Sequence, residues 1–249
     1  MLSLASGRSV KKMISSERVS LTDSLYSEIQ GRIITWQITP NEILVEARLA
    51  EEYNVSKTPV REALALLSQE GLVEVLPRVG YRVTSIGIGD VHEIFDLRLL
   101  LEPEAVALAA KRATKEEVLA LLETNRKWLE KLAREESLSS KTYLRFHDSF
   151  HMGIANLSEN RRLARFISAL LRDSARVRMS DPLMSIRGID EDRELPKQVT
   201  QALFERNEEE ARKLLHQHIA DSKERILAQL IHPQSKNQRV VLRKDVASN

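Results

Sequence analysis

The sequence predicts a mainly α-helical protein in two parts, a small helical domain that ends in a β-hairpin and a larger all-helical domain. Three observations support this. Glycine and proline are sparse, at 8 and 7 of 249 residues. Apolar residues recur at helical spacing along most of the chain. The period changes only once, between residues 72 and 86, where β-formers flank the turn sequence PRVG. A chain of this length has room for one large domain or two ordinary ones.

The composition restricts the class of protein. There are no cysteines, which excludes disulfides and thiolate metal sites and fits a reducing compartment. No apolar run approaches the ~18 residues of a membrane helix, so no membrane partner is expected. The N-terminus lacks the apolar core of a secretory signal, and a cytoplasmic location is therefore the expectation. The net charge of +2 neither favours nor opposes nucleic acid.

The N-terminal part is expected to hold three helices and a hairpin. Residues 1–17 are polar and are predicted to form a flexible arm. Helical patterns follow within 20–38, 39–55 and 56–71; in the last of these, Gly71 stands where a helix end favours glycine. Val73, Val75, Tyr81 and Val83 then predict a two-stranded hairpin. These elements define a domain at residues 18–86.

The rest of the chain is expected to be helical. The sequence GIGD at 87–90 reads as the linker, and an all-helical domain is expected at 91–231. Cap residues followed three positions later by glutamate mark helix starts at Asp90, Thr114 and Asn207. Amphipathic stretches fill the gaps at 141–157, 160–179 and 190–206. The weakly patterned residues 232–249 are predicted to be a flexible tail.

Two short helices joined by a tight turn and followed by a hairpin suggest a winged helix-turn-helix, a DNA-binding fold. Ser56, Lys57 and Thr58 lie at the start of the second helix, where free backbone amides attract phosphate. Arg61 follows, and arginine has the two-pronged geometry that reads guanine. Arg48, one helix earlier, is placed to clamp a phosphate.

The charge balance of this domain offers an alternative reading. Residues 18–85 hold seven Lys and Arg against nine acidic residues, so a domain-wide basic surface is absent and the charges could be a solvated helix face. The positive residues cluster at the second helix and the hairpin, however, and local clustering is what docking into a groove requires. We therefore favour DNA binding.

The stretch LVEARLAEEYNVSKTPVREALALLSQEGLVEVLPRVGYRV resembles the DNA-binding domain of GntR-family transcription regulators. The resemblance covers roughly residues 20–85. It implies DNA contacts at Arg48, Ser56, Lys57, Thr58 and Arg61, with Gly80 at the tip of the wing. Two positions depart from the family pattern. Lys57 replaces an arginine, which keeps the charge but loses the fork, and Asn41 replaces a turn glycine. The family resemblance also implies a homodimer on an inverted-repeat operator.

His147 and His151 lie four residues apart, so a helix would place both imidazoles on one face, within reach of one metal ion or one anionic ligand. Simple packing of histidines inside a bundle is the alternative. From the residues alone, both readings stay open.

The order of the segments at 93–110, 146–163 and 202–219 resembles the FadR-like branch of the family, whose FCD effector domain is an all-helical bundle. Many members hold a metal through an Asp and three His, beside a small carboxylate effector. The resemblance places His147 at the Asp position, His151 at the first His position and His218 at the last. The remaining His position falls at or beside Pro196. It therefore implies a site for one divalent ion, zinc or similar, at His147, His151 and His218.

Arg98 lies among apolar residues in FDLRLLLEP and is expected near the interior, where a guanidinium needs an anionic partner. The resemblance implies that it binds the effector carboxylate. The alternative is a salt bridge between helices.

The function predicted is a ligand-responsive DNA-binding regulator, in the family most often a repressor of a metabolic operon, and not an enzyme. Two alternatives remain. A metal-dependent enzyme could be tethered by its DNA-binding domain, although no nucleophile elbow, phosphate loop or carboxylate–histidine pair is evident in the sequence. A constitutive DNA-binding protein with a decayed pocket is the other, suggested by Pro196.

Overall fold

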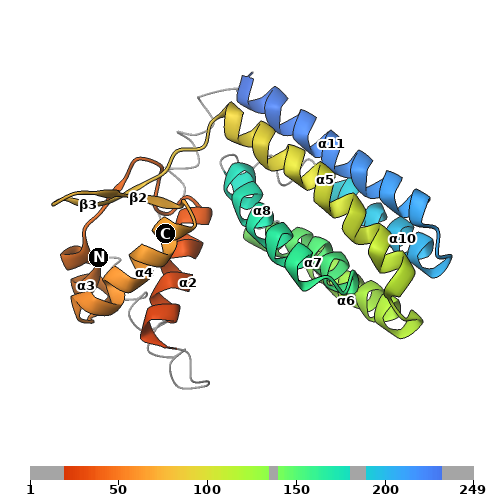
Figure 1. Cartoon of the computed structure of the whole chain (residues 1–249), viewed down its shortest axis with the longest axis horizontal. Helices are drawn as coiled ribbons and strands as arrows, with labels where there is room; N and C mark the ends of the chain where they lie inside the picture. Colours follow the sequence, from red (N-terminus) through yellow and green to blue (C-terminus); the bar gives the residue numbers. More distant parts are fainter. Residues whose placement is uncertain (1–19, 135–139, 180–188, 232–249) are drawn as a thin grey trace. The chain divides into compact units, whose positions relative to one another are not determined.

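The computed structural model describes residues 20–134, 140–179 and 189–231, and within these the chain divides into two compact units between Ile86 and Gly87 (Figure 1). The predicted flexible arm at 1–17 and tail at 232–249 lie outside the described residues. Within the described part, no helix is long and apolar enough to cross a membrane.

The first unit packs three helices around an apolar core. These helices are α2 (Leu21–Ile34), α3 (Glu46–Tyr53) and α4 (Lys57–Gln69). The α2 helix begins at a Ser20 cap whose hydroxyl accepts from the Asp23 amide, and it packs against α4. The buried apolar side chains on α4 are the four that the helical period predicts, Val60, Ala63, Leu64 and Leu67.

The sheet has three strands, one more than the sequence predicted. β2 (Val73–Leu76) and β3 (Gly80–Val83) form the expected antiparallel hairpin. β1 (Ile43–Leu44) adds to the other edge of β3, with Leu44 opposite Tyr81. The sequence placed Leu44 on a helix, and this is wrong. The Leu44 side chain is buried, as it would also be on a helix. A strand of two residues is too short for the spacing of apolar residues to distinguish it from a helix.

The start of β3 requires glycine. Gly80 has φ +146°, and a Cβ built there would lie 2.3 Å from the carbonyl oxygen of Leu44 on β1. The turn that precedes it closes with the Val79 amide donating to the Leu76 carbonyl, and Arg78 in this turn has φ +65°. The wing is therefore held against β1 by a close approach of two backbones that only glycine permits.

The second unit is an all-helical bundle, as predicted. Its helices are α5 (Ile88–Arg112), α6 (Lys115–Arg134), α7 (Ser140–Leu157), α8 (Arg161–Met179), α10 (Ile189–Phe204) and α11 (Glu208–Ile231). The long helix α5 runs beside α11 and also packs against α7 and α8 (Figure 1). The α6 helix covers α7 and α10. Within this unit, the helices α7, α10 and α11, which carry the predicted histidines and Pro196, all pack against α5.

Helix α5 begins earlier than the sequence suggested. Its cap is Gly87, and the Gly87 amide donates to the Asp90 carboxylate at 2.7 Å, so Asp90 lies inside the first turn. Residues 88–90, which the sequence assigned to a linker, belong to the helix because Asp90 satisfies the cap from within. The cap predicted at Thr114 is confirmed, since Thr114 and Glu117 exchange bonds between side chains and backbone amides.

We expect Gly80→Ala to destabilise the first unit by about 1–3 kcal/mol, because the new methyl meets the Leu44 carbonyl and the backbone is strained. Urea unfolding, monitored by the fluorescence of Trp36, measures this. The measurement uses a Trp128→Phe background, so that the second unit contributes no tryptophan fluorescence. Gly31→Ala in α2, where a Cβ meets nothing within 4 Å, is the matched control and should be neutral or stabilising. Equal stability of the Gly80→Ala and parent proteins would contradict the packing argument.

Candidate functional site

The predicted DNA-contact residues of the two helices all lie at the surface of the first unit. Arg48 is exposed on α3, and Ser56, Lys57 and Thr58 are exposed at the N-terminus of α4. The Ser56 hydroxyl makes no capping bond to the α4 backbone. The start of α4 therefore presents backbone amides together with side-chain donors, which is the arrangement that attracts a phosphate.

Arg61 lies one turn further along α4 and is held by a carboxylate. Its Nε is 3.0 Å and its Nη2 is 2.8 Å from the oxygens of Glu46, at the start of α3. This bidentate bond lowers the pKa of Glu46, with the charges of Arg61 and Lys57 adding to the effect. The Arg61 side chain remains 64 % exposed. Sequence reasoning identified Arg61 but missed Glu46, because nothing in the sequence shows that residues fifteen apart meet.

On the wing, the exposed tip of the turn is formed by Arg78 and Val79, whereas Gly80 is partly buried against β1. The sequence offered Gly80 as the tip residue. The structure gives it a packing role and places a cation, Arg78, at the exposed tip. Pro77 is the signal that could have located it, since proline favours the second position of a β-turn and so places Arg78 third.

The three predicted metal-ligand histidines converge in the core of the second unit. His147 and His151 on α7 and His218 on α11 offer nitrogen atoms that all lie within 4.8 Å of one another. The ring centroids of His147 and His151 are 4.2 Å apart, and that of His218 lies 5.3 Å from His151. The Nε2 atoms of His147 and His151 are buried without a hydrogen-bond partner among the described residues. Buried polar atoms without a partner indicate a missing ligand, ion or water.

A buried carboxylate orients one of these histidines. Glu102 on α5 is 2 % exposed and contacts Nδ1 of His151 with one oxygen. Its other oxygen accepts from Nε of Arg98 at 2.5 Å. No carboxylate–histidine pair is evident in the sequence, but the structure provides one, because Glu102 contacts His151 from a position 49 residues earlier in the chain. The sequence signal for Glu102 was its spacing of four residues from Arg98, which places a carboxylate beside an arginine that was expected in the interior.

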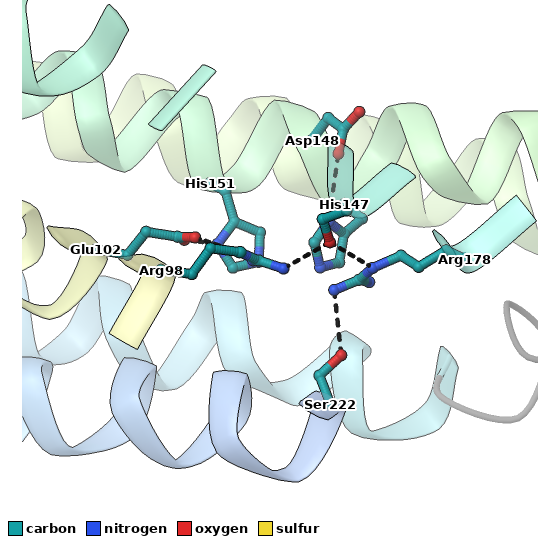
Figure 2. A network of polar contacts seen from close by, with 8 residues as sticks. Arg98, Glu102, His147, Asp148, His151, Arg178 and Ser222 are labelled. Atoms are coloured by element: carbon teal, nitrogen blue, oxygen red, sulfur yellow. Dashed lines mark hydrogen bonds and ion pairs between the residues drawn. The ribbon is translucent and has the colours of Figure 1, made fainter. Parts of the chain in front are cut away.

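Arg98 is fully buried, as expected, and its partner lies on its own helix instead of a neighbouring one. It also donates through Nη1 to the Ser174 hydroxyl at 2.9 Å, and its Nη2 has no hydrogen-bond partner among the described residues. A second buried guanidinium, Arg178 on α8, donates to Ser174 and, at 3.1 Å, to Ser222 on α11. Figure 2 shows the two arginines reaching toward the histidines from different helices.

The protonation of the pocket follows from this burial. Burial lowers the pKa of His147 and His218 well below the usual value, and the nearby Arg178 adds to the shift. Burial also lowers the pKa of His151, although the Glu102 carboxylate opposes it. Burial alone would raise the pKa of Glu102, but Arg98 and His151 outweigh it and the pKa is lowered. The imidazoles are therefore neutral and Glu102 is ionised.

An ionised carboxylate only accepts hydrogen bonds, so His151 donates from Nδ1 and carries its lone pair on Nε2. Asp148 lies outside this core. Its Oδ1 is 3.4 Å from Nδ1 of His147 and, although 35 % of the side chain is exposed, burial of the carboxyl raises its pKa to about 7.

The space beside the histidines is small. A cavity of about 10 Å³ is lined by the three histidines together with Phe146, Phe150 and Leu195. This is close to the least volume that holds one water molecule. Pro196, predicted to fall at the fourth ligand position, is buried inside α10, and its neighbour Leu195 closes the cavity with an apolar wall. The pocket as it stands fits an ion or a water molecule, not an organic acid.

The residues present suit a divalent metal ion. Three neutral imidazoles form an acceptable ligand set for zinc, with a position left open for water or a carboxylate. Metal-bound histidines typically donate their other ring N–H to a carboxylate, and His151 does so to Glu102 while its Nε2 stays available for an ion. His92 and His216, which the sequence set aside, are exposed and take no part.

A winged helix-turn-helix joined to an all-helical domain with a buried polar pocket defines a DNA-binding transcription regulator. Residues 21–83 match the family model of bacterial regulatory proteins of the gntR family, and residues 93–221 match the FCD domain. The chain therefore belongs to the GntR family, in the group whose second domain is FCD. The family predicted from the sequence is confirmed.

Individual relatives agree with this assignment. The chain is 30 % identical over 200 residues to the HTH-type transcriptional repressor GlaR of Escherichia coli, covering 78 % of this chain and 90 % of that one. It is 34 % identical over 138 residues to the HTH-type transcriptional regulator YdhC of Bacillus subtilis, covering 55 % of this chain and 61 % of that one. The solved structure of E. coli McbR/YncC has the same fold, with a TM-score of 0.72 at 24 % identity over 85 % of this chain and 99 % of that one.

We expect Glu102→Gln to weaken zinc binding roughly 10- to 100-fold, because an amide no longer fixes the tautomer and orientation of His151. Competition against a chromophoric chelator measures the affinity, and circular dichroism checks that the helices are retained. Glu104→Gln, which changes an exposed carboxylate two residues further along α5, is the control. If Glu102→Gln binds zinc as tightly as the parent protein, Glu102 does not act through the metal ligands.

Proposed function

We propose that this regulator binds an inverted-repeat operator as a homodimer and represses transcription until a small carboxylate binds its helical domain. The observation that carries the DNA part is the cluster of exposed donors at the start of α4, Ser56, Lys57 and Thr58, with Arg61 beside it. A single winged-helix unit covers one half-site, and two copies related by a two-fold axis match a palindrome. The repressor names of relatives such as GlaR support the sign of the response.

We propose that the pocket binds its effector at Arg98 and at a metal held by His147, His151 and His218. Nη2 of Arg98 is the donor that supports this role, since it is buried and has no hydrogen-bond partner among the described residues. Guanidinium binds carboxylate with two parallel bonds. A bound divalent ion would act as a Lewis acid that attracts the same carboxylate.

The small cavity gives the sensor a mechanical basis. With about 10 Å³ beside the histidines, a carboxylate can enter only if the surrounding helices move apart. Leu195 on α10 and Phe150 on α7 form walls that would have to shift. Ligand binding is then coupled to a rearrangement of the bundle, which is the differential interaction that a ligand needs to bias a regulator between two states.

The alternative functions have less support. An enzyme would need a general base that is free to accept a proton, and both oxygens of Glu102 are already bound, one to Arg98 and one to His151. A constitutive binder with a decayed pocket would not explain why Nη2 of Arg98 and the Nε2 atoms of His147 and His151 are buried without a partner among the described residues, since such atoms indicate a ligand, ion or water.

We expect Arg61→Ala to weaken operator binding by about 1–3 kcal/mol, roughly 5- to 150-fold, and to relax preference at one base pair, because the bidentate reader is lost. Gel-shift titration against an operator selected from a random pool measures both. Lys115→Ala, which removes one exposed charge from α6, should bind as the parent protein does. Normal binding and preference in Arg61→Ala would show that the recognition surface is wrongly placed.

We expect a carboxylate from a metabolite panel to raise the melting temperature of the zinc-loaded protein and to release operator DNA. At one hundred times its dissociation constant such a ligand stabilises by about 2.7 kcal/mol. Both effects should disappear in Arg98→Lys, which keeps the charge but loses the fork. If no carboxylate stabilises the protein or releases the DNA, the sensor proposal is wrong.

A further inference from the structure

Arg61 on α4, the expected recognition helix, is paired with a carboxylate from the neighbouring helix α3. Glu46 is the first residue of α3, and Arg61 lies in the second turn of α4. The carboxylate of Glu46 binds the side edge of the guanidinium, formed by Nε and Nη2, with three contacts of 2.8 to 3.1 Å. The end edge, formed by Nη1 and the second Nη2 proton, makes no hydrogen bond within the described part of the chain and belongs to a side chain that is 64 % exposed.

We propose that Glu46 positions Arg61 for DNA, binding its side edge so that its end edge is presented to an acceptor on the duplex. This rests on the proposed DNA-binding function. The acceptor is either the O6/N7 edge of a guanine or a pair of phosphate oxygens, since both accept two parallel bonds from a guanidinium. Glu46 does not touch the DNA in this scheme. It acts through Arg61 and is a positioning residue.

The first reason for this assignment is conformational. A free arginine side chain samples many rotamers and loses that freedom when it binds. Glu46 is itself anchored, because it is only 23 % exposed and stands at a helix N-terminus, where the macrodipole favours a carboxylate. A guanidinium that is already held in the free protein has less freedom left to lose on the DNA.

The second reason is electrostatic and bears on discrimination. A carboxylate beside the recognition helix repels phosphates, so it opposes binding to DNA at which Arg61 finds no matching acceptor. At the operator the same carboxylate is compensated by the bonds that the oriented guanidinium makes. Glu46 therefore lowers non-specific binding and raises specific binding. A simple lock, in which Glu46 withdraws Arg61 from DNA, would lower both.

An exposed ion pair is also too weak to act as a lock. Pairs of this kind contribute little net stability in water and are easily exchanged for another partner. The pair is strong enough to choose one rotamer of Arg61, and the end edge remains available without breaking it. The geometry therefore favours a role for Glu46 in orienting Arg61 toward DNA, and not in withholding Arg61 from it.

The test compares Glu46→Gln with Glu51→Gln. Glu51 is an exposed residue farther along α3, so its substitution removes the same charge from the same helix. Each full-length protein is titrated against the selected operator and against a scrambled duplex at several salt concentrations. We expect Glu46→Gln to weaken operator binding roughly 2- to 12-fold, the range for immobilising one flexible side chain. We expect its binding to the scrambled duplex to be equal or tighter, so that the specificity ratio falls, while Glu51→Gln keeps the ratio.

A double-mutant cycle shows whether Glu46 acts through Arg61. In an Arg61→Ala background, Glu46→Gln should not weaken operator binding further. An operator panel with single base-pair changes separates the two acceptors. Loss of preference at one base pair indicates guanine, and a uniform loss with a smaller salt slope indicates phosphate. Either result supports the inference, because both acceptors use the oriented edge.

A measurement without DNA tests the geometry directly. The Nε–H resonance of Arg61 should exchange slowly with water in the parent protein and fast in Glu46→Gln. The inference is overturned if the specificity ratio of Glu46→Gln equals that of the parent, if its operator binding tightens, or if the loss persists in the Arg61→Ala background. A parent protein without any sequence preference would instead refute the proposed function, and the inference with it.

Discussion

The helical domain depends on a buried carboxylate held between a guanidinium and an imidazole. Glu102 binds Arg98 within α5 and His151 on α7, and all three side chains are almost completely excluded from solvent. A buried charge is tolerated only when it is paired, and removing one partner of such a pair typically costs about 3–5 kcal/mol. This contact therefore fixes the register of α5 against α7 and decides which nitrogen of His151 faces the centre of the bundle.

The rest of the pocket is arranged around this contact. His147 is carried by the same face of α7 as His151, so orienting one imidazole also places the other. Arg98 extends the network to Ser174 on α8, and Arg178 continues it to Ser222 on α11. Hydrogen bonds thus join α5, α8 and α11, and the cavity beside the histidines is barely large enough for a water molecule. A ligand that enters it has to rearrange polar bonds on several helices together, because in a packed core these have few alternative positions.

The DNA-binding unit uses charge differently. Its acidic residues outnumber its basic ones over residues 18–85, so affinity cannot come from a uniformly positive surface. The donors are concentrated at the start of α4. Glu46 binds Arg61, which projects from the second turn of α4. On the wing, Gly80 lets β3 approach β1 closely, and this sets the place of the turn that carries Arg78. In both places a local contact fixes the position of one arginine, Arg61 on α4 or Arg78 on the wing.

The sequence by itself determined the family, the order of the helices and the identity of the residues in the histidine cluster. Helical periodicity and caps such as Thr114 with Glu117 are local properties, and a four-residue spacing is enough to place His147 and His151 on one face. Tertiary structure alone decided the third strand and the partners of the charged residues. Glu46 meets Arg61, and Glu102 meets His151, across distances in the chain over which no periodicity operates. Which carboxylate pairs with which cation depends on how helices pack, and that is set by the whole core at once.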